Sequence, residues 1–374
     1  MKRLADHSKQ NTGDLSIILM VTVLVIFGIV MIFSASYYYA IGAWNDAYHY
    51  LKSQLMWVAV GSFGMWITSR LDYHFWLRLW IIGPIFCLIL LLLIFTPLGQ
   101  EVNGATRWLA IKGVPGTIMP GEFAKVGIIL YITGHFSKNP KSAADWWKGV
   151  VPVLLVAGVY FGLIMKQPNM STAFTVVLIA GGMLLVAGIP WKHVGVLFAM
   201  GAIAAVVFVL GDPDGYRYRR FTSFLDPFAD ALGDGWQVVQ SLLALGSGGL
   251  TGLGLGNSVQ KNLYLPEAQN DFILAIIGEE LGFIGILALV FVYVLLLWRG
   301  CHTAMNARDY TGMMLASGIT MMVGIQVVIN IAVVTSSMPP TGIILPFVSY
   351  GGNALVIFMG AMGILYNISK SADL

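Results

Sequence analysis

An aspartate at the mouth of a long apolar run is the first residue in this sequence that could do chemistry. Asp271 closes the stretch NLYLPEAQND (residues 262–271), and a mostly apolar run follows it as far as Trp298. A carboxylate in that place can act as a general base or as a cation ligand at a membrane surface. It can equally cap the helix that follows, because Asp is a preferred N-cap and suits the positive helix end. The two roles are compatible, and position alone leaves both open.

Two further carboxylates, Glu279 and Glu280, lie deeper in the same run. Eight helical residues separate Asp271 from Glu279 by about 12 Å, with a rotation of about 80°. That is too far for the carboxylate pair of a glycosidase-like mechanism, whose carboxyls lie about 5–10 Å apart. We therefore expect Glu279 and Glu280 to be buried, hydrogen-bonded structural groups.

Glu122 and Lys125 form a second candidate pair, in the motif PGEFAK. Three residues apart, they lie one above the other on a helix face. Charges inside a bilayer are rare, usually paired and often functional. The pair therefore serves either to fix helix packing or to form part of a site.

Basic residues gather in the stretch GYRYRRFTSF, which carries Arg217, Arg219 and Arg220. Arg grips phosphate or diphosphate groups bidentately, so this stretch suits an anionic ligand. Contact with anionic lipid headgroups is the alternative.

Arg107, with Lys112 nearby, belongs to the same outer basic set. Lys166 lies at the outer end of a span, where its side chain can reach to the interface. Pro168 breaks the helix there and frees backbone groups that can line a cavity.

Other common site signals are missing from the sequence. The run GSGGLTGLGLG lacks the Gly-Lys-Ser/Thr ending of a phosphate-binding Walker motif, so it predicts a flexible turn or a close backbone approach. The six His residues show no metal-ligand spacing, and Cys87 and Cys301 indicate neither a disulfide framework nor a metal site. A net charge of +3 gives no indication of nucleic-acid binding.

The elements that must position these residues are membrane helices. The chain is 57% hydrophobic and 10% charged, with a mean hydropathy of +0.79, whereas soluble domains carry about 25% charged residues. We predict an all-α integral membrane protein that forms a single domain over residues 1–374. Ten spans are long enough to cross a hydrocarbon core of about 30 Å: 15–36, 53–69, 76–96, 118–136, 149–166, 171–189, 194–210, 271–298, 311–335 and 343–367.

The distribution of Lys and Arg predicts the orientation of these spans. With the N-terminus inside, the inner segments hold twelve basic residues and the short outer segments hold four, Lys52, Arg107, Lys112 and Lys166. Both termini are then cytoplasmic. The first apolar segment is longer than a signal-peptide core of about 7–15 residues, so we expect it to be a retained helix.

Residues 211–270 form a large outer loop between the seventh and eighth spans. The loop is far longer than a typical connection of about 4–6 residues, and its aromatic residues and leucines argue against disorder. The stretch WQVVQSLLALGSGG has near-helical apolar spacing and predicts a short helix that lies in the interface or dips back into the membrane. No internal repeat is visible, which disfavours transporter folds built from two related halves.

The outer Arg residues and Asp271 together predict an outward-facing site for a phosphate-bearing substrate. Such a site fits glycosyl transfer from a lipid-linked sugar at the outer leaflet. It also fits a transporter for an anionic substrate, and residue chemistry does not choose between the two.

The order of the motifs NGATRW, PGEFAK, KQPNMSTA, YRYRRFTSFLDPFAD and PPTGIILPFVSYGGN resembles the SEDS family (shape, elongation, division and sporulation). The long motif from Gly235 to Gly285, ending in ELGFIG, is the most specific of them. The resemblance covers nearly the whole chain. The stretches LLWRGCHTAM and GIQVVINIAVVT are closer to the FtsW/SpoVE division and sporulation branch than to the RodA elongation branch.

The resemblance implies a peptidoglycan glycosyltransferase in the cytoplasmic (inner) membrane. The family polymerises lipid II, an undecaprenyl-diphosphate-linked disaccharide-pentapeptide, and works with a class B penicillin-binding protein among other division or elongation proteins. The family's essential aspartate falls at Asp271, as a proposed general base in an inverting transfer. Arg217 and Arg220 match the family's YR..R pattern and are the candidate diphosphate contacts, and Glu122, Lys125 and Gln240 match further family positions. Arg107 and Lys166 complete the candidate substrate contacts.

Three positions depart from the family pattern. Asn169 stands where the family usually has Asp, and Gly121 and Asn353 stand where it usually has Ser. An intramembrane carboxylate has thus become neutral at Asn169, three residues from Lys166. We therefore do not expect this site to take part in charge pairing.

Two other functions and one cofactor stay open at this stage. A lipid II flippase would move its substrate without forming polymer, and a division-machinery scaffold would tolerate changes at Asp271, Arg217 and Arg220. No metal site is predicted from protein ligands. Diphosphate leaving groups often use a divalent ion, so Mg²⁺ or Mn²⁺ is a candidate cofactor that the sequence does not require.

Overall fold

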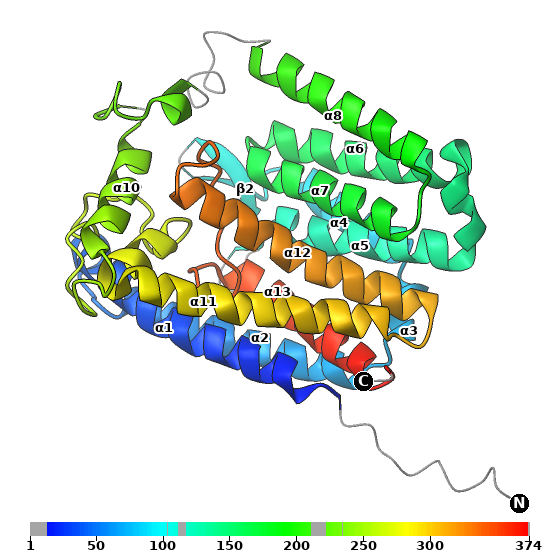
Figure 1. The fold of residues 1–374 in the computed structure, drawn as a ribbon, viewed down its shortest axis with the longest axis horizontal. Coiled ribbons are helices and arrows are strands. Elements are labelled where there is room, and N and C mark those ends of the chain that lie inside the picture. Colours follow the sequence, from blue (N-terminus) through cyan, green and yellow to red (C-terminus); the bar gives the residue numbers. More distant parts are fainter. Residues whose placement is uncertain (1–12, 103, 111–116, 211–221, 234, 373–374) are drawn as a thin grey trace, which may run out of the picture.

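The computed structural model describes residues 13–102, 104–110, 117–210, 222–233 and 235–372 as a bundle of roughly aligned helices with one small hairpin (Figure 1). The helices are α1 (Leu15–Trp44), α2 (His49–Arg70), α3 (His74–Arg78), α4 (Ile82–Leu93), α5 (Pro120–Lys138), α6 (Val151–Lys166), α7 (Met170–Val186), α8 (Trp191–Leu210), α10 (Trp236–Gly248), α11 (Ile273–Met305), α12 (Tyr310–Val334) and α13 (Gly352–Ser369). A 3₁₀ turn (Pro140–Ala144) and a π-helical turn (Trp146–Val150) precede α6, and the antiparallel strands β1 (Gly99–Val102) and β2 (Ala105–Leu109) form the hairpin.

The apolar length of the helices confirms the predicted membrane character, while the count of ten spans stays a prediction. Among the described residues, five helical segments are long and apolar enough to cross a membrane: Leu15–Trp44, Trp146–Lys166, Ile273–Met305, Tyr310–Val334 and Gly352–Ser369. The segments Ile82–Leu93, Met170–Val186 and Trp191–Ile203 are apolar but shorter. The chain is therefore a multi-pass helical membrane protein.

The last predicted span begins in the wrong place. We expected a helix from residue 343, but α13 begins at Gly352. Residues 343–345 have no regular structure and residues 346–350 form turns and bends, with the Ser349 hydroxyl accepting the N–H of Leu345 at 2.8 Å and Pro346 lacking an N–H of its own. This segment is buried against the site described below.

α5 and α12 lie at the centre of the bundle. α12 packs against α11, α7, α5 and α13, while α2 runs along α13 and α1 along α11 (Figure 1). α8 lies at the edge, and of its described side chains only His193, near the start, is buried, with its ring centre 5.1 Å from that of the Trp146 ring. Further along α8, Phe198 is 79% exposed.

α11 is broken at Gly282, and a neighbouring loop completes its hydrogen bonds. Gly282 has φ +68° and ψ −171°, which is not helical. The N–H groups of Leu253 and Gly254 donate to the carbonyls of Glu279 and Glu280, each at 2.9 Å. In return, the N–H groups of residues 283 and 284 donate to the carbonyls of residues 249 and 250 at 2.9 and 3.1 Å.

Close backbone contact explains the glycine run at residues 246–256. A Cβ at Gly248 would lie 1.9 Å from the carbonyl oxygen of Gly278, and one at Gly252 would lie 2.2 Å from that of Glu280. Of the two expectations for this run, close backbone approach is confirmed for these two positions.

α10 confirms the predicted short helix, but it is part of the bundle. It packs on α11, and its Ser241 hydroxyl donates to the carbonyl of Val334 at the end of α12 at 2.8 Å. Val238, Gln240 and Ala244 are buried on the same helix. α10 therefore attaches the segment that precedes α11 to the ends of two membrane helices.

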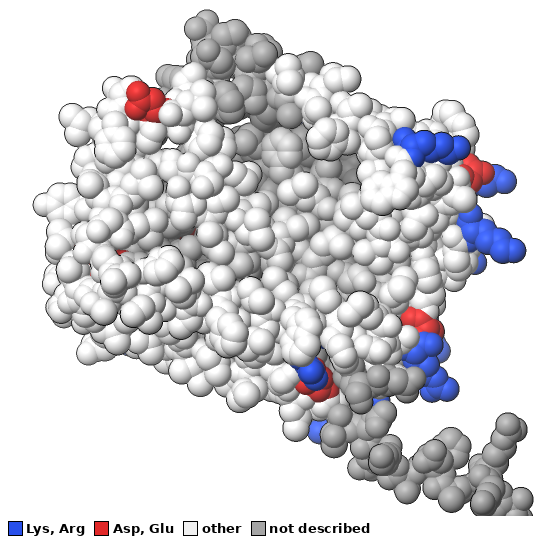
Figure 2. Space-filling model, in the orientation of Figure 1, with Lys and Arg blue, Asp and Glu red and all other residues white. Residues whose placement is uncertain are grey.

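Charge is concentrated at one end of the bundle. Figure 2 shows most of the visible Lys and Arg side chains at the end from which the N-terminus leaves, while the broad face between the ends is almost entirely uncharged. Such a face suits contact with lipid.

Candidate functional site

Asp271 lies in the turn before α11, at the end of this helix that is far from the basic end of the bundle, and it is partly exposed. The N-cap is Phe272, whose carbonyl accepts the N–H of Ala275 at 2.9 Å, so the prediction that Asp271 caps this helix is wrong. Its carboxylate instead lies beside Gly342, where a Cβ would be 3.5 Å from Oδ2. The side chain is thus directed to the segment before α13.

The main chain at Asp271 is fixed from two directions. The Asn330 side chain on α12 donates to the Asp271 carbonyl at 2.7 Å. The N–H of Tyr350 donates to the carbonyl of Gln269 at 2.9 Å. The turn is therefore attached to α12 and to the segment that leads into α13.

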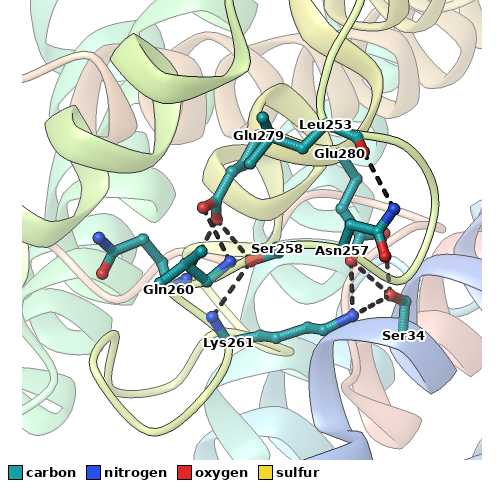
Figure 3. Close-up of polar contacts among 9 residues, drawn as sticks. Ser34, Leu253, Asn257, Ser258, Gln260, Lys261, Glu279 and Glu280 are labelled. Carbon is teal, nitrogen blue, oxygen red and sulfur yellow. Dashed lines mark hydrogen bonds and ion pairs between the residues drawn. The ribbon is translucent and has the colours of Figure 1, made fainter.

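The Glu279 carboxylate binds the preceding loop. It accepts the Ser258 hydroxyl at 2.5 Å and the N–H groups of Val259 and Gln260 at 2.9 and 3.3 Å (Figure 3). Glu279 is 1% exposed. Three donors compensate for the burial of this charge, which confirms the structural role expected of it.

The Glu280 carboxylate points to α1 and forms a buried ion pair. Lys261 Nζ lies 2.8 Å from Glu280 Oε1, and the Ser34 hydroxyl on α1 donates to the same carboxylate at 2.6 and 2.8 Å (Figure 3). Lys261 Nζ also lies 3.1 Å from Ser34 Oγ. Sequence reasoning did not identify Lys261 or Ser34. A lone lysine in a glycine-rich stretch ahead of two intramembrane glutamates was the available signal for Lys261.

A second polar cluster surrounds the start of α5. Lys125 Nζ lies 2.6 Å from Glu122 Oε2 with both side chains buried, and 5.4 Å from the centre of the Phe358 ring. The predicted ion pair is confirmed. A Cβ on the neighbouring Gly121 would lie 3.0 Å from the Thr172 side chain and 3.8 Å from Asn169 Nδ2, so two departures from the family pattern face each other.

The remaining predicted contacts adjoin this cluster or lie elsewhere. The Arg107 guanidinium donates to the carbonyl of Pro168, next to Asn169, whose side chain caps α7 by accepting the N–H of Thr172. Lys166 ends α6 and is exposed. Gln240 is buried on α10. Arg217 and Arg220 lie outside the described residues, as do Arg219 and Lys112.

The segment between α12 and α13 connects the turn at Asp271 with the polar cluster at the start of α5. Its Gly342 lies beside the Asp271 carboxylate, and just beyond it the Asn353 amide donates to the carbonyl of Thr117 at 2.6 Å, ahead of α5. One short segment therefore borders both Asp271 and the Glu122–Lys125 region.

The groups near Asp271 that could hold a cation are oxygen atoms. No set of three or more His, Cys, Asp or Glu side chains able to hold a metal occurs in the described ranges. The buried atoms Asn270 Oδ1 and Thr341 Oγ1 have no hydrogen-bond partner there. One carboxylate with neutral oxygens fits a hard ion such as Mg²⁺, which keeps several waters and relies on substrate phosphates.

Comparison with known proteins places this geometry in context. Residues 14–374 match a family model described as a cell cycle protein of the FtsW, RodA and SpoVE type. The chain is 41% identical over 377 residues to a probable peptidoglycan glycosyltransferase FtsW of Trichlorobacter lovleyi, covering 100% of this chain and 95% of that protein. It is 39% identical over 365 residues to the stage V sporulation protein E of Bacillus subtilis, covering 97% and 98%.

A solved structure shares the fold. A chain from a peptidoglycan synthase complex that coordinates polymerization and crosslinking has 26% identity and a TM-score of 0.78, covering 96% of this chain and 97% of that chain. The bundle is therefore an architecture found in peptidoglycan synthesis.

Proposed function

Because the chain belongs to the FtsW, RodA and SpoVE family of cell cycle proteins, we propose that it is a peptidoglycan glycosyltransferase that polymerises lipid II. Relatives named for this activity cover nearly the whole chain. The process served is cell division or sporulation, in keeping with the FtsW and SpoVE names of the two relatives above.

In this proposal the chain is a single domain with ten spans in the cytoplasmic (inner) membrane, and both termini are cytoplasmic. Residues 211–270 then form the outer loop between the seventh and eighth spans. The gathering of basic side chains at one end of the bundle supports this orientation (Figure 2). Asp271 and Arg299 lie at opposite ends of α11, so Asp271 faces the outside.

Asp271 is the proposed general base. It takes the proton of the acceptor sugar's 4-hydroxyl as that oxygen bonds to the anomeric carbon of the donor, and the lipid diphosphate leaves with the bonding electrons. Inversion at that carbon needs one base. The observation that carries this assignment is the contrast among three acids: Glu279 and Glu280 are buried and fully bonded, whereas Asp271 is partly exposed.

The other predicted residues are proposed substrate contacts. Arg217 and Arg220 are the candidates for the diphosphate. Arg107 adds a guanidinium with five donors, at least one of which the Pro168 carbonyl uses. Lys166 is exposed at the end of α6. Glu122, Lys125 and Gln240 complete the set as buried polar groups.

A divalent cation, Mg²⁺ or Mn²⁺, is a further proposal. Asp271 is the carboxylate that would hold it, and the unbonded oxygens of Asn270 and Thr341, close to it in the sequence or beside Gly342, are further candidate ligands. When bound, such an ion would neutralise charge on the diphosphate leaving group.

The proposed partner is a class B penicillin-binding protein. The structural relative belongs to a complex that coordinates polymerization with crosslinking, and crosslinking is transpeptidase chemistry. The partner would supply that step beside the glycan strand, with other division or elongation proteins around it.

The test is polymerisation of lipid II by purified protein, with and without the partner. Asp271→Asn should lower the rate by about 10²–10⁴-fold, since it removes a general base. Glu267→Gln is the matched control, because Glu267 is an exposed acid four residues earlier in the same loop. Full activity of Asp271→Asn would exclude this residue as the base. Movement of lipid II across vesicles without polymer would favour the flippase instead.

A further inference from the structure

We propose that Asn330 is a positioning residue for Asp271, which holds the base at the working distance from the acceptor sugar. The inference rests on the proposed function, because it assigns a role within the same reaction. Asn330 touches the main chain of Asp271 and not the substrate, so its effect is exerted through that residue.

One amide group connects three elements at this point. Asn330 lies on α12 and is fully buried. Its Nδ2 donates to the carbonyl of Asp271 at 2.7 Å and to the carbonyl of Ile343 at 2.7 Å. The turn before α11 and the segment before α13 are therefore joined through a single side chain.

The two bonded carbonyls flank the position of the carboxylate. Ile343 follows Gly342, and Gly342 lies beside Asp271 Oδ2. Gly342 has φ +70°, a conformation that other residues rarely adopt, so this part of the segment has a defined shape. Asn330 thus fixes the main chain of Asp271 relative to the segment at Gly342 and Ile343, which the Asp271 carboxylate faces.

The balance of hydrogen bonds shows what Asn330 contributes. Its Oδ1 is buried and has no partner within the described residues, whereas both N–H groups are used. Leaving a buried polar atom without a partner costs about 1–3 kcal/mol. Among the described residues, the contribution of this side chain is therefore its two donated bonds.

Removing these donors should disturb the turn more than the fold. The hydrogen bond from the Tyr350 N–H to the Gln269 carbonyl would still hold the turn before α11 to the segment before α13. Asp271 could then move by a fraction of an ångström to an ångström, and a misplacement of about 1 Å costs about 10²-fold in rate.

Asn330→Ala and Asn330→Asp test the inference, since Ala lacks the amide and the Asp carboxylate cannot donate when ionised. Gln326→Leu is the matched control. Gln326 is a buried amide one turn earlier on α12, and its Nε2 contacts only the Met322 carbonyl of its own helix, at 3.5 Å, among the described contacts.

The first measurement is the lipid II polymerisation rate per folded molecule, with folded protein quantified by gel filtration. We expect kcat to fall about 100-fold in both Asn330 variants with KM within about twofold of wild type, because a positioning defect lowers transition-state binding. Gln326→Leu should keep the wild-type kcat even where its melting temperature falls. A wild-type kcat in the folded Asn330 variants would overturn the inference.

The second measurement does not depend on activity. Hydrogen–deuterium exchange should rise in the peptide that covers residues 262–272 in Asn330→Ala, and stay at the wild-type level there in Gln326→Leu. Equal exchange in all three proteins would overturn the positioning role. A wild-type protein that makes no polymer would count against the proposed function, and exchange would still report whether Asn330 holds the turn.

Discussion

At the scale of single residues, the surroundings of each carboxylate decide its role. Glu279 and Glu280 lie inside the protein, where an ionised carboxylate is stable only with partners, and Ser34, Ser258 and Lys261 supply them. Asp271 lies at the helix entrance with its main chain fixed and its side chain partly exposed. Its main chain is thus fixed while its side chain reaches the surface of the protein.

Asn169 shows how a neutral residue can replace the acid that the family usually has. Its side chain caps α7, a task that Asn and Asp perform about equally well. The exposed Lys166 and the Pro168 carbonyl bound by Arg107 lie beside it. The structural part of this position therefore survives the loss of charge.

The first prediction concerns this cap. Asn169→Ala should destabilise the protein by about 1 kcal/mol, because the N–H of Thr172 loses its acceptor, and Asn169→Asp should stay close to wild type. Thermal unfolding in detergent measures both. An equal loss in the two variants would mean that the amide has a role other than capping.

At the scale of elements, the break in α11 is the feature that shapes the site. It divides the helix into a short, buried part that begins next to Asp271 and a longer part that ends at Met305. Broken membrane helices occur where protein can satisfy the freed backbone groups. Here residues 249–254 do so, and the loop that leads to Asp271 is thereby attached to the helix.

A second prediction tests this break. A Cβ at Gly282 would lie 2.4 Å from the Gly252 nitrogen and 2.5 Å from the Leu250 oxygen, both backbone atoms. Gly282→Ala should therefore displace the loop and lower the melting temperature sharply. Gly158→Ala is the control, since a Cβ there meets nothing within 4 Å in a helix, and it should be neutral or stabilising. Equal melting temperatures for the two variants would contradict the close approach.

A third prediction concerns the ion pair beside the break. Lys261→Met leaves the buried Glu280 charge unpaired, and Glu280→Gln leaves the buried Lys261 charge unpaired. Each change should therefore lower the free energy of unfolding by about 3–5 kcal/mol. The double variant should be much less unstable than the sum of the two, because neither charge then remains. A double-mutant cycle on unfolding free energies measures the coupling. Additive losses would show that Lys261 and Glu280 do not interact.

At the scale of the whole molecule, helix ends far apart in sequence meet at the basic end of the bundle. Asp14 caps α1, its carboxylate lies 2.5 Å from Arg299 Nε near the end of α11, and its N–H donates to Ser369 of α13 at 2.9 Å. Three helices are thus connected at one point, away from the proposed site.

A fourth prediction follows from the titration of Asp14. Burial raises its pKa, but the Arg299 and Ser16 hydrogen bonds and the Arg299 charge outweigh this, so the pKa lies below its usual 3.8. A lowered pKa contributes stability at neutral pH that is lost as the pH falls through the folded-state value. The advantage of wild type over Asp14→Asn in thermal unfolding should be full at pH 7 and shrink below about pH 4. An advantage independent of pH would exclude the charge as its source.

The sequence by itself determined the membrane character, the approximate position of most helices and the Glu122–Lys125 pair. These depend on apolar length and on local spacing, which a helix converts directly into position. The tertiary structure decided what surrounds Asp271. Asn330 is 59 residues from its partner Asp271, and Ser34 is 246 residues from Glu280.

No local pattern contains such contacts. In the sequence, Asn330 is one polar residue in an apolar run. The predicted start of α13 and the capping alternative for Asp271 both failed at segments where distant parts of the chain meet. Local propensity sets helices, but the partners of buried polar groups are chosen by packing, because each donor and acceptor taken out of water must find whichever group the fold brings beside it.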